Sequence, residues 1–321
     1  MLKIARQKRR DGAPLLAASS YASLILVVSG CSTGALLYGY KYALAGEQGL
    51  SAPGLAFSNL VISLPLLLSF LPGILRDSAR SIGSADRLIL FISPLLIAGC
   101  CLLLGLAPRS TELVVGLLFF VNASAVASMA TMNAMLAALA KRFGLSGRIS
   151  ALGILMSNGT SVALLSLTGF LATRSGFSAI CFVSAGLALP VAFLAVFRPT
   201  SLFPAEPSPR RGGQPRADGR AIWQTIRRLA TDRPACLAAS ICFLWDFTPG
   251  FGTPLFYRYI GELHMSPQQF EFTATIGMLG GTLSAVAYLR LCLLLASRTL
   301  LPSAVAVAVA GSSGLLFVNG Y

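Results

Sequence analysis

Nine long apolar stretches, separated mostly by short polar loops, constrain this chain more than any other feature. A helix needs about 20 apolar residues to cross the roughly 30 Å hydrocarbon core of a bilayer. The stretches that meet this requirement lie at about residues 17–41, 54–75, 88–107, 112–139, 149–172, 176–197, 234–257, 268–289 and 300–320. The sequence therefore predicts an all-α, polytopic membrane protein with about nine transmembrane helices.

The positive charges support this count and give the chain a direction. With a cytoplasmic N-terminus, 21 of the 25 Lys and Arg residues fall on cytoplasmic segments. The four that fall elsewhere are Lys41, Arg109, Arg174 and Arg258. Because cytoplasmic loops carry an excess of Lys and Arg, the alternation predicts an N-terminus inside the cell. The compact loops favour a bacterial inner membrane, with a plasma membrane as the alternative.

Composition excludes several classes of protein. Charged residues make up 11% of the chain, against about 25% in a typical soluble domain. The net charge of +14 is explained by the basic loops. The sequence shows no basic face with interleaved aromatic residues, the pattern that would predict nucleic-acid binding. The seven cysteines and the single histidine, His264, show no metal-binding spacing. We therefore expect no metal, no cofactor, and the lipid bilayer as a partner.

One long loop divides the chain. Residues 199–232 are rich in Pro, Arg, Gly and Ser, a composition that cannot bury a core. We expect a cytoplasmic linker here, between a six-helix half at 1–198 and a partial half with three helices at 233–321.

Asp246 is the most informative single residue. At 1.5 Å per helical residue it lies roughly 18 Å into its span, near the bilayer centre. A charge there costs at least about 2.5–3.5 kcal/mol, so it normally faces a cavity or a partner. Four helix-breaking residues follow it: Pro249, Gly250, Gly252 and Pro254. We expect an interrupted helix that brings Asp246 and Trp245 to a substrate- or proton-binding cavity; a protonated Asp246 bonded between helices is the alternative.

Other polar residues lie in apolar spans and are candidates for the same site. Asn122 and Asn158 lie in the fourth and fifth spans, Ser32 and Thr33 in the first, and Lys41 at its outer end. Hydrogen bonding between helices is the alternative for the neutral residues, and anchoring at the membrane surface is the alternative for Lys41. Two pairs of glycines four residues apart predict close helix packing: Gly30 with Gly34, and Gly277 with Gly281.

The loop after the second span resembles a signature of the major facilitator superfamily, in which glycine and aspartate precede basic residues. The matching positions are Gly73, Arg76, Asp77 and Arg80. The resemblance implies a latch that holds two halves together on the cytoplasmic side. A plain basic loop is the alternative.

Residues 243–281 resemble the folate–biopterin transporters, a branch of that superfamily. The matching segments are 243–249, 252–257 and 262–270, followed by Gly277 and the pair Gly280-Gly281. The chain differs at Tyr42, where the family usually has an acidic residue, and at Ser69-Phe70, where it usually has Lys-Pro. The resemblance implies a twelve-helix architecture, so we expect a C-terminally truncated chain, a genuine nine-helix protein being the alternative.

The predicted function is secondary active transport by alternating access. The resemblance implies import of a pteridine- or folate-like solute, with the proton as a coupling ion. One alternative is a non-transporting truncated remnant or membrane assembly factor. A membrane-embedded enzyme is the weakest alternative, because the inner loops carry only scattered acidic residues. We therefore expect a transporter and not an enzyme.

Overall fold

The computed structural model describes residues 2–69, 85–106, 110–143, 146–196 and 256–294, with short further pieces between 227 and 310. Every element in the main ranges is a helix, which confirms the all-α fold. The elements are α1 (Leu2–Lys41), η1 (Tyr42–Glu47), α2 (Ala52–Leu67), α4 (Ala85–Leu106), α5 (Thr111–Phe143), α6 (Ser146–Arg174), α7 (Gly176–Val196), η3 (Arg258–Glu262) and α11 (Pro267–Leu294). The two η elements are π-helical turns.

Within the described ranges, six helices are long and apolar enough to cross a bilayer. These spans are Ser23–Gly46, Asp86–Leu106, Thr111–Ala138, Leu152–Arg174, Gly176–Val196 and Pro267–Ala287. They confirm six of the nine predicted stretches. The second predicted stretch corresponds to α2, which is apolar but shorter. Most residues of the stretches predicted at 234–257 and 300–320 lie outside the described residues.

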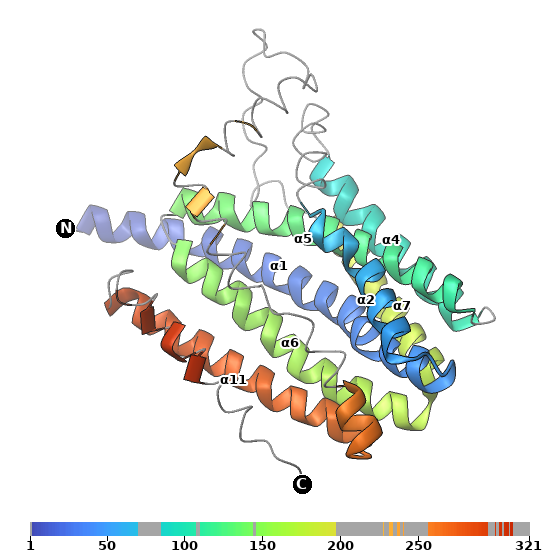
Figure 1. The fold of residues 1–321 in the computed structure, drawn as a ribbon. Helices are drawn as coiled ribbons and strands as arrows, with labels where there is room; N and C mark the ends of the chain where they lie inside the picture. The colour runs from blue at the N-terminus through green and yellow to red at the C-terminus, as the bar shows by residue number, and fades with distance from the viewer. Residues whose placement is uncertain are drawn as a thin grey trace.

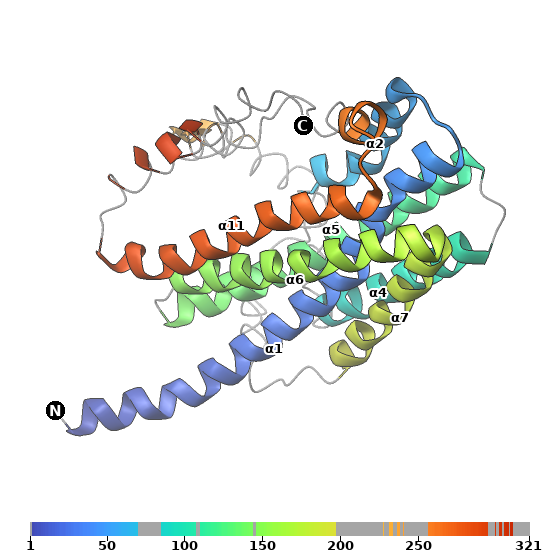
Figure 2. The same ribbon diagram turned by 90° about the horizontal axis from the view of Figure 1, so that it is seen from below.

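The helices form an elongated bundle in which α1 runs from the N-terminal end to the opposite end (Figures 1 and 2). The turns η1 and η3 both lie at that opposite end, which we call the η1–η3 end. The helix α6 packs against α1 on one side and α11 on the other. Close approaches show that α1 and α6 run in the same direction, since Gly30 faces Thr160 and Gly34 faces Leu164.

The helix α11 runs in the opposite direction to α6. Gly169, near the end of α6, faces Glu271, near the start of α11. Asn158, further back on α6, faces Gly281, further along α11. The chain thus leaves α7 at the N-terminal end and reappears at Phe256 at the η1–η3 end. This is the direction that the predicted order of spans requires of α11.

Turn residues explain how the chain reverses at the η1–η3 end. Ser51 is extended and precedes Pro53 in the first turn of α2, a position where proline fits a helix start. Gly176 has a φ of 70° between α6 and α7, a conformation that glycine adopts without the steric cost of a side chain.

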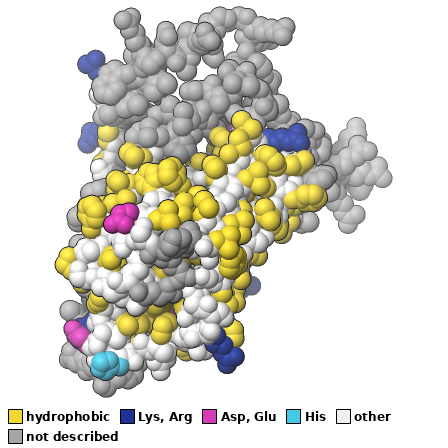
Figure 3. Space-filling model, turned by 90° about the vertical axis from the view of Figure 1, so that its right-hand side faces the viewer, with side chains coloured by type: hydrophobic (Ala, Val, Ile, Leu, Met, Phe, Trp, Pro, Cys, Tyr) yellow, Lys and Arg dark blue, Asp and Glu magenta, His cyan; other side chains and the backbone are white. Residues whose placement is uncertain are grey.

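The outward faces of the helices carry large apolar side chains. Phe57, Phe193 and Leu283 are between 65% and 68% exposed, and apolar side chains cover much of the surface in Figure 3. Such surfaces would associate in water, but in a bilayer they meet acyl chains. The belt of exposed apolar residues therefore agrees with an integral, multi-pass membrane protein.

Two groups of buried apolar residues hold the bundle together. The larger one lies towards the η1–η3 end and includes Leu36, Leu118 and Ile180. The smaller one, around Ile25 and Leu90, lies towards the N-terminal end. Glycines bring α1 close to its neighbours, since a Cβ on Gly34 would lie 2.9 Å from Leu164 Cδ1.

The two predicted glycine pairs behave differently. Gly30 and Gly34 both contact α6, as expected of a close helix pair. Gly281 also contacts α6, because a Cβ there would lie 2.8 Å from Asn158 Nδ2. Gly277 has no neighbour within 4 Å among the described residues. Only one glycine of the second pair therefore mediates close packing here.

We expect Ile180→Ala to destabilise the bundle and Leu189→Ala, on the same helix, to leave its stability nearly unchanged. Ile180 is fully buried, whereas Leu189 is 52% exposed. Truncating a buried Ile costs about 2–5 kcal/mol through lost contacts and the cavity left behind. Apparent melting temperatures of the purified variants in detergent would measure the difference. Equal melting temperatures would contradict the described packing of α7.

Candidate functional site

Three of the predicted mid-bilayer residues make hydrogen bonds to backbone carbonyls. The hydroxyls of Ser32 and Thr33 both donate to the carbonyl of Ser29, at 2.8 and 3.0 Å, and both side chains are buried. The Asn122 amide donates to the carbonyl of Ile62 on α2 at 2.6 Å. Asn122 thus ties α5 to α2, whereas the two hydroxyls are engaged within α1.

Asn158 has a different environment. Its half-buried side chain lies between α6 and α11, against Gly281. Among the described residues, no protein group is hydrogen-bonded to its amide. One turn further along α6, Ser161 accepts a hydrogen bond from the Tyr38 hydroxyl on α1 at 3.3 Å. Polar groups of α1 and α6 therefore gather near the middle of α6, and the Asn158 amide can still form hydrogen bonds.

Several predicted site residues lie outside the described residues. Asp246 and Trp245 are among them, as are the four residues of the predicted helix break, Pro249, Gly250, Gly252 and Pro254. The residues of the predicted cytoplasmic latch, Gly73, Arg76, Asp77 and Arg80, also lie outside. Their roles remain predictions.

Glu271 is a site residue that sequence reasoning missed. It lies in the second turn of α11, and its side chain is only 3% exposed. The hydroxyl of Tyr42, in η1, donates to its Oε1 at 2.8 Å. Its Oε2 is buried and has no hydrogen-bond partner among the described residues. Lys41, at the end of α1, is close enough for its charge to act on this carboxyl.

A simple signal could have found Glu271. It is the single acidic residue in the apolar stretch at 268–289. Ionisable residues within spans are rare and are functional candidates by default. Its partners could not be read from the sequence, because Tyr42 and Glu271 are separated by 229 positions.

Gly169 allows α11 to approach α6 beside this carboxyl. A Cβ at Gly169 would lie 3.0 Å from Glu271 Cβ and 3.2 Å from the Cα of Gln268. Any larger side chain would therefore press on the backbone of α11. One turn along α11, the Thr275 hydroxyl lies 3.4 Å from that of Ser166 on α6. The helices α6 and α11 thus touch through small and polar groups along this seam.

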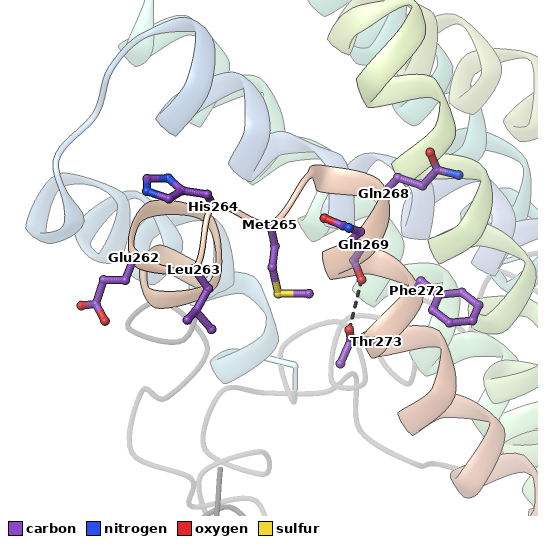
Figure 4. A pocket seen from close by; sticks show the side chains of 8 residues that line it. All are labelled: Glu262, Leu263, His264, Met265, Gln268, Gln269, Phe272 and Thr273. Atoms are coloured by element: carbon purple, nitrogen blue, oxygen red, sulfur yellow. Dashed lines mark hydrogen bonds between the residues drawn. The ribbon is translucent and has the colours of Figure 1, made fainter. Parts of the chain in front are cut away.

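A cavity of about 760 Å³ lies beside η3 (Figure 4). Its described lining comes from a single segment, residues 262–273, and includes Glu262, His264 and Phe272. Two of its lining residues are joined by a hydrogen bond of 3.0 Å from the Thr273 hydroxyl to the carbonyl of Gln269. We place the candidate site at Asn158 instead, because its side chain lies between α6 and α11, two helices that are distant in the sequence. Within the described ranges, no three His, Cys, Asp or Glu side chains come together as a metal site.

Comparison with known proteins places this fold in a family. The family model of the Major Facilitator Superfamily matches residues 14–321. This chain belongs to the major facilitator superfamily. The predicted superfamily is thereby confirmed, and a superfamily protein of this kind is a membrane transporter of small solutes and not an enzyme. Neither the curated proteins nor the solved structures gave a match to the chain.

Proposed function

We propose that this major facilitator protein imports a pteridine- or folate-like solute together with protons, by alternating access. The similarity of residues 243–281 to the folate–biopterin transporters supports the solute class. The contact of α6 with α11 supports the alternating movement, because it joins residues 1–198 to residues 233–321 through small and polar groups that can separate. In the proposed orientation the N-terminus is cytoplasmic and the η1–η3 end faces outward.

The observation that carries this proposal is the Asn158 amide. It lies about 6–8 Å from the midpoints of the two neighbouring spans Leu152–Arg174 and Pro267–Ala287, and about 15 Å along α11 from Glu271, at 1.5 Å per residue. An amide offers both donors and an acceptor, and pteridine rings present the complementary groups at their edges. Secondary transporters hold their solutes near the bilayer midplane, between their two halves. Lys41, Ser32, Thr33, Asn122 and the predicted pair Trp245 and Asp246 complete the proposed solute and proton pathway.

The cytoplasmic end, opposite the η1–η3 end, requires its own closure in this mechanism. We assign it to the loop residues Gly73, Arg76, Asp77 and Arg80, in which an acidic side chain and neighbouring bases can pair across the halves. Closure would then alternate between this loop and the η1–η3 end. Such an exchange makes the central site accessible from one side at a time.

Uptake into vesicles tests the proposal. The purified chain, reconstituted into liposomes, should accumulate radiolabelled folate or biopterin when the outside is more acidic than the inside. Collapsing the pH gradient with a protonophore should abolish the accumulation. Absence of uptake by a correctly folded chain, with and without the gradient, would contradict the proposed function and favour the non-transporting alternative.

We expect Asn158→Ala to lower the uptake of the labelled solute about twofold to tenfold at subsaturating concentration. Loss of one well-formed hydrogen bond to a bound solute is worth about 0.5–1.5 kcal/mol, and 1.4 kcal/mol corresponds to a factor of ten. Ser157→Ala is the matched control, because the neighbouring Ser157 is exposed on the same helix. Equal losses in both variants would contradict a role for Asn158 in solute binding.

A further inference from the structure

The chain builds the same turn twice, once in each half. Residues 42–51 and 257–266 align without a gap and are identical at four positions. The identical pairs are Tyr42 with Tyr257, Gly46 with Gly261, Glu47 with Glu262, and Ser51 with Ser266. Each copy contains a π-helical turn, η1 in the first and η3 in the second.

The backbone hydrogen bonds of the two copies also correspond. In the first, the amides of Gln48 and Leu50 donate to the carbonyls of Ala43 and Leu44, at 3.1 and 2.9 Å. In the second, equivalent bonds of 3.0 and 2.9 Å join Leu263 to Arg258 and Met265 to Tyr259. A residue with positive φ separates the two donors in each copy: Gly49 at 64° and His264 at 51°. The two copies are therefore equivalent in structure as well as in sequence.

The equivalent tyrosines reach across to opposite halves. Tyr42, in the first copy, donates its hydroxyl to Glu271 Oε1 on α11 at 2.8 Å. Tyr257, in the second copy, donates to the carbonyl of Leu50 at 2.5 Å. Each half thus contributes one donor and one acceptor to this joint. We call Tyr42, Tyr257, Glu271 and the Leu50 carbonyl the tyrosine clasp.

An aromatic contact fills the space inside the clasp. Phe256 is 2% exposed, and its ring centroid lies 5.6 Å from that of Tyr42 and 5.5 Å from that of Phe270. Phe256 also belongs to the large buried group of the first half. The joint is therefore closed and packed, so water is excluded from the Glu271 carboxyl.

The Glu271 carboxyl is buried in this closed arrangement, and one of its oxygens is unpaired. The described charged and titratable groups that face it are Lys41 at the end of α1 and Tyr42 in η1. The adjacent residue of α6 is Gly169, which carries no charge. Lys41 makes no direct ion pair with the carboxyl among the described residues, and the buried Oε2 lacks a donor. A neutral carboxylic acid costs far less to bury than an unpaired carboxylate.

We propose that the tyrosine clasp is a proton-responsive closure, in which Glu271 binds a proton as the η1–η3 end closes and releases it as that end opens. Since a neutral Glu271 is favoured only when buried, the closed form binds the proton more tightly than the open form. By reciprocity, protonation shifts the population towards the closed form. The place of this closure in a transport cycle rests on the proposed function, but the closure itself requires no solute.

Spin labels on the two copies test the proposal directly. The sites are Gly46→Cys and Gly261→Cys, because both glycines are exposed and neither has a neighbour within 4 Å of an added Cβ. The labels are introduced after replacement of the seven native cysteines, in a background that keeps the native melting temperature. Electron spin resonance distances are then measured in nanodiscs between pH 5 and 9, without solute. The population at short distance should increase as the pH falls.

Single substitutions identify the groups responsible. Glu271→Gln, which imitates the neutral acid, should keep the short distance at every pH. Tyr42→Phe and Tyr257→Phe should each lower the ratio of closed to open molecules about twofold to tenfold, the range expected for one net hydrogen bond. Tyr21→Phe is the matched control for the tyrosines, since Tyr21 bonds Leu194 inside the first half at 2.9 Å. Glu112→Gln, at an exposed carboxylate of α5, is the control for Glu271.

Three outcomes would overturn the proposal. One is a distance distribution that does not change with pH in the otherwise native chain, a measurement that does not depend on the folding of any Glu271 variant. Another is opening in acid, which would show that an ionised Glu271 paired with Lys41 holds the closed form. The third is a pH response that persists in Glu271→Gln. Loss of solute uptake alone would contradict the proposed function but would not contradict the proton-responsive closure.

Discussion

Asp246→Asn is expected to lower proton-driven uptake of the solute at least about tenfold and to remove its dependence on the pH gradient. Asp246 lies roughly 18 Å into its predicted span at 1.5 Å per residue. A carboxyl at that depth can exchange a proton with an aqueous cavity and, when ionised, attract or repel a charged solute. Asn keeps the shape of the side chain but cannot bind a proton reversibly. Uptake into liposomes, at several outside pH values and a constant inside pH, would measure the change.

Asp232→Asn is the matched control for this substitution. Asp232 is exposed and lies shortly before the same predicted span, so the chemical change is identical and the depth is different. The control should retain full uptake and its normal dependence on pH. Asp246→Asn with unchanged uptake and unchanged pH dependence would show that Asp246 is bonded between helices and takes no part in transport. The proton site would then have to be sought elsewhere, with Glu271 as the first candidate.

The membrane architecture could be predicted because it depends on local sequence features, namely long apolar stretches. A span needs a long apolar stretch, and every described spanning helix lies over one. The direction of α11 relative to α6 also follows from the predicted order of the spans. The start of one helix was not predicted: α1 begins at Leu2, well before the apolar stretch that starts at residue 17. The polar segment before residue 17 extends this helix, and hydropathy alone does not indicate such an extension.

The environment of each polar residue could not be predicted, because it depends on helices that are distant in sequence. Asn122 and Asn158 looked equivalent as amides in apolar spans. Their environments differ in the structure: Asn122 is bonded to the Ile62 carbonyl, and Asn158 lies against Gly281 between α6 and α11. Ser32 and Thr33 find their partner within their own helix. The two amides are distinguished only by the placement of α5 beside α2 and of α6 beside α11.

Tyr42 shows how a departure from a family pattern can be interpreted. The folate–biopterin transporters, which residues 243–281 resemble, usually have an acidic residue at this position. In this chain the Tyr42 hydroxyl is bonded to a carboxyl that α11 supplies. The carboxyl at this joint is therefore supplied by α11, 229 positions further along the chain. Glu271 lies close to the predicted start of its span, where a charged side chain can reach the membrane surface, so the sequence alone does not show that it is buried.

Gly169→Leu is expected to separate α6 from α11 at the η1–η3 end and to destabilise the folded chain. An added Cβ would already lie 3.0 Å from Glu271 Cβ and 3.2 Å from Gln268 Cα, and the remaining atoms of leucine need further space. A side chain could rotate away, but the backbone of α11 has to move as a unit. Overpacking of this kind costs about 1–3 kcal/mol. The apparent melting temperature in detergent should fall, and the hydrogen bond from Tyr42 to Glu271 should be lost.

Gly159→Leu is the control that separates packing from helix propensity. Gly159 lies on the same helix, is exposed, and has no neighbour within 4 Å of an added Cβ. Replacing a helical glycine generally stabilises a helix by up to about 1 kcal/mol, so Gly159→Leu should keep or raise the melting temperature. With labels at Gly46→Cys and Gly261→Cys, Gly169→Leu should also lengthen the distance at every pH, even in combination with Glu271→Gln. A short distance in that double variant would mean that α11 docks on the first half without the contact at Gly169, and the seam between α6 and α11 would then not control closure of the η1–η3 end.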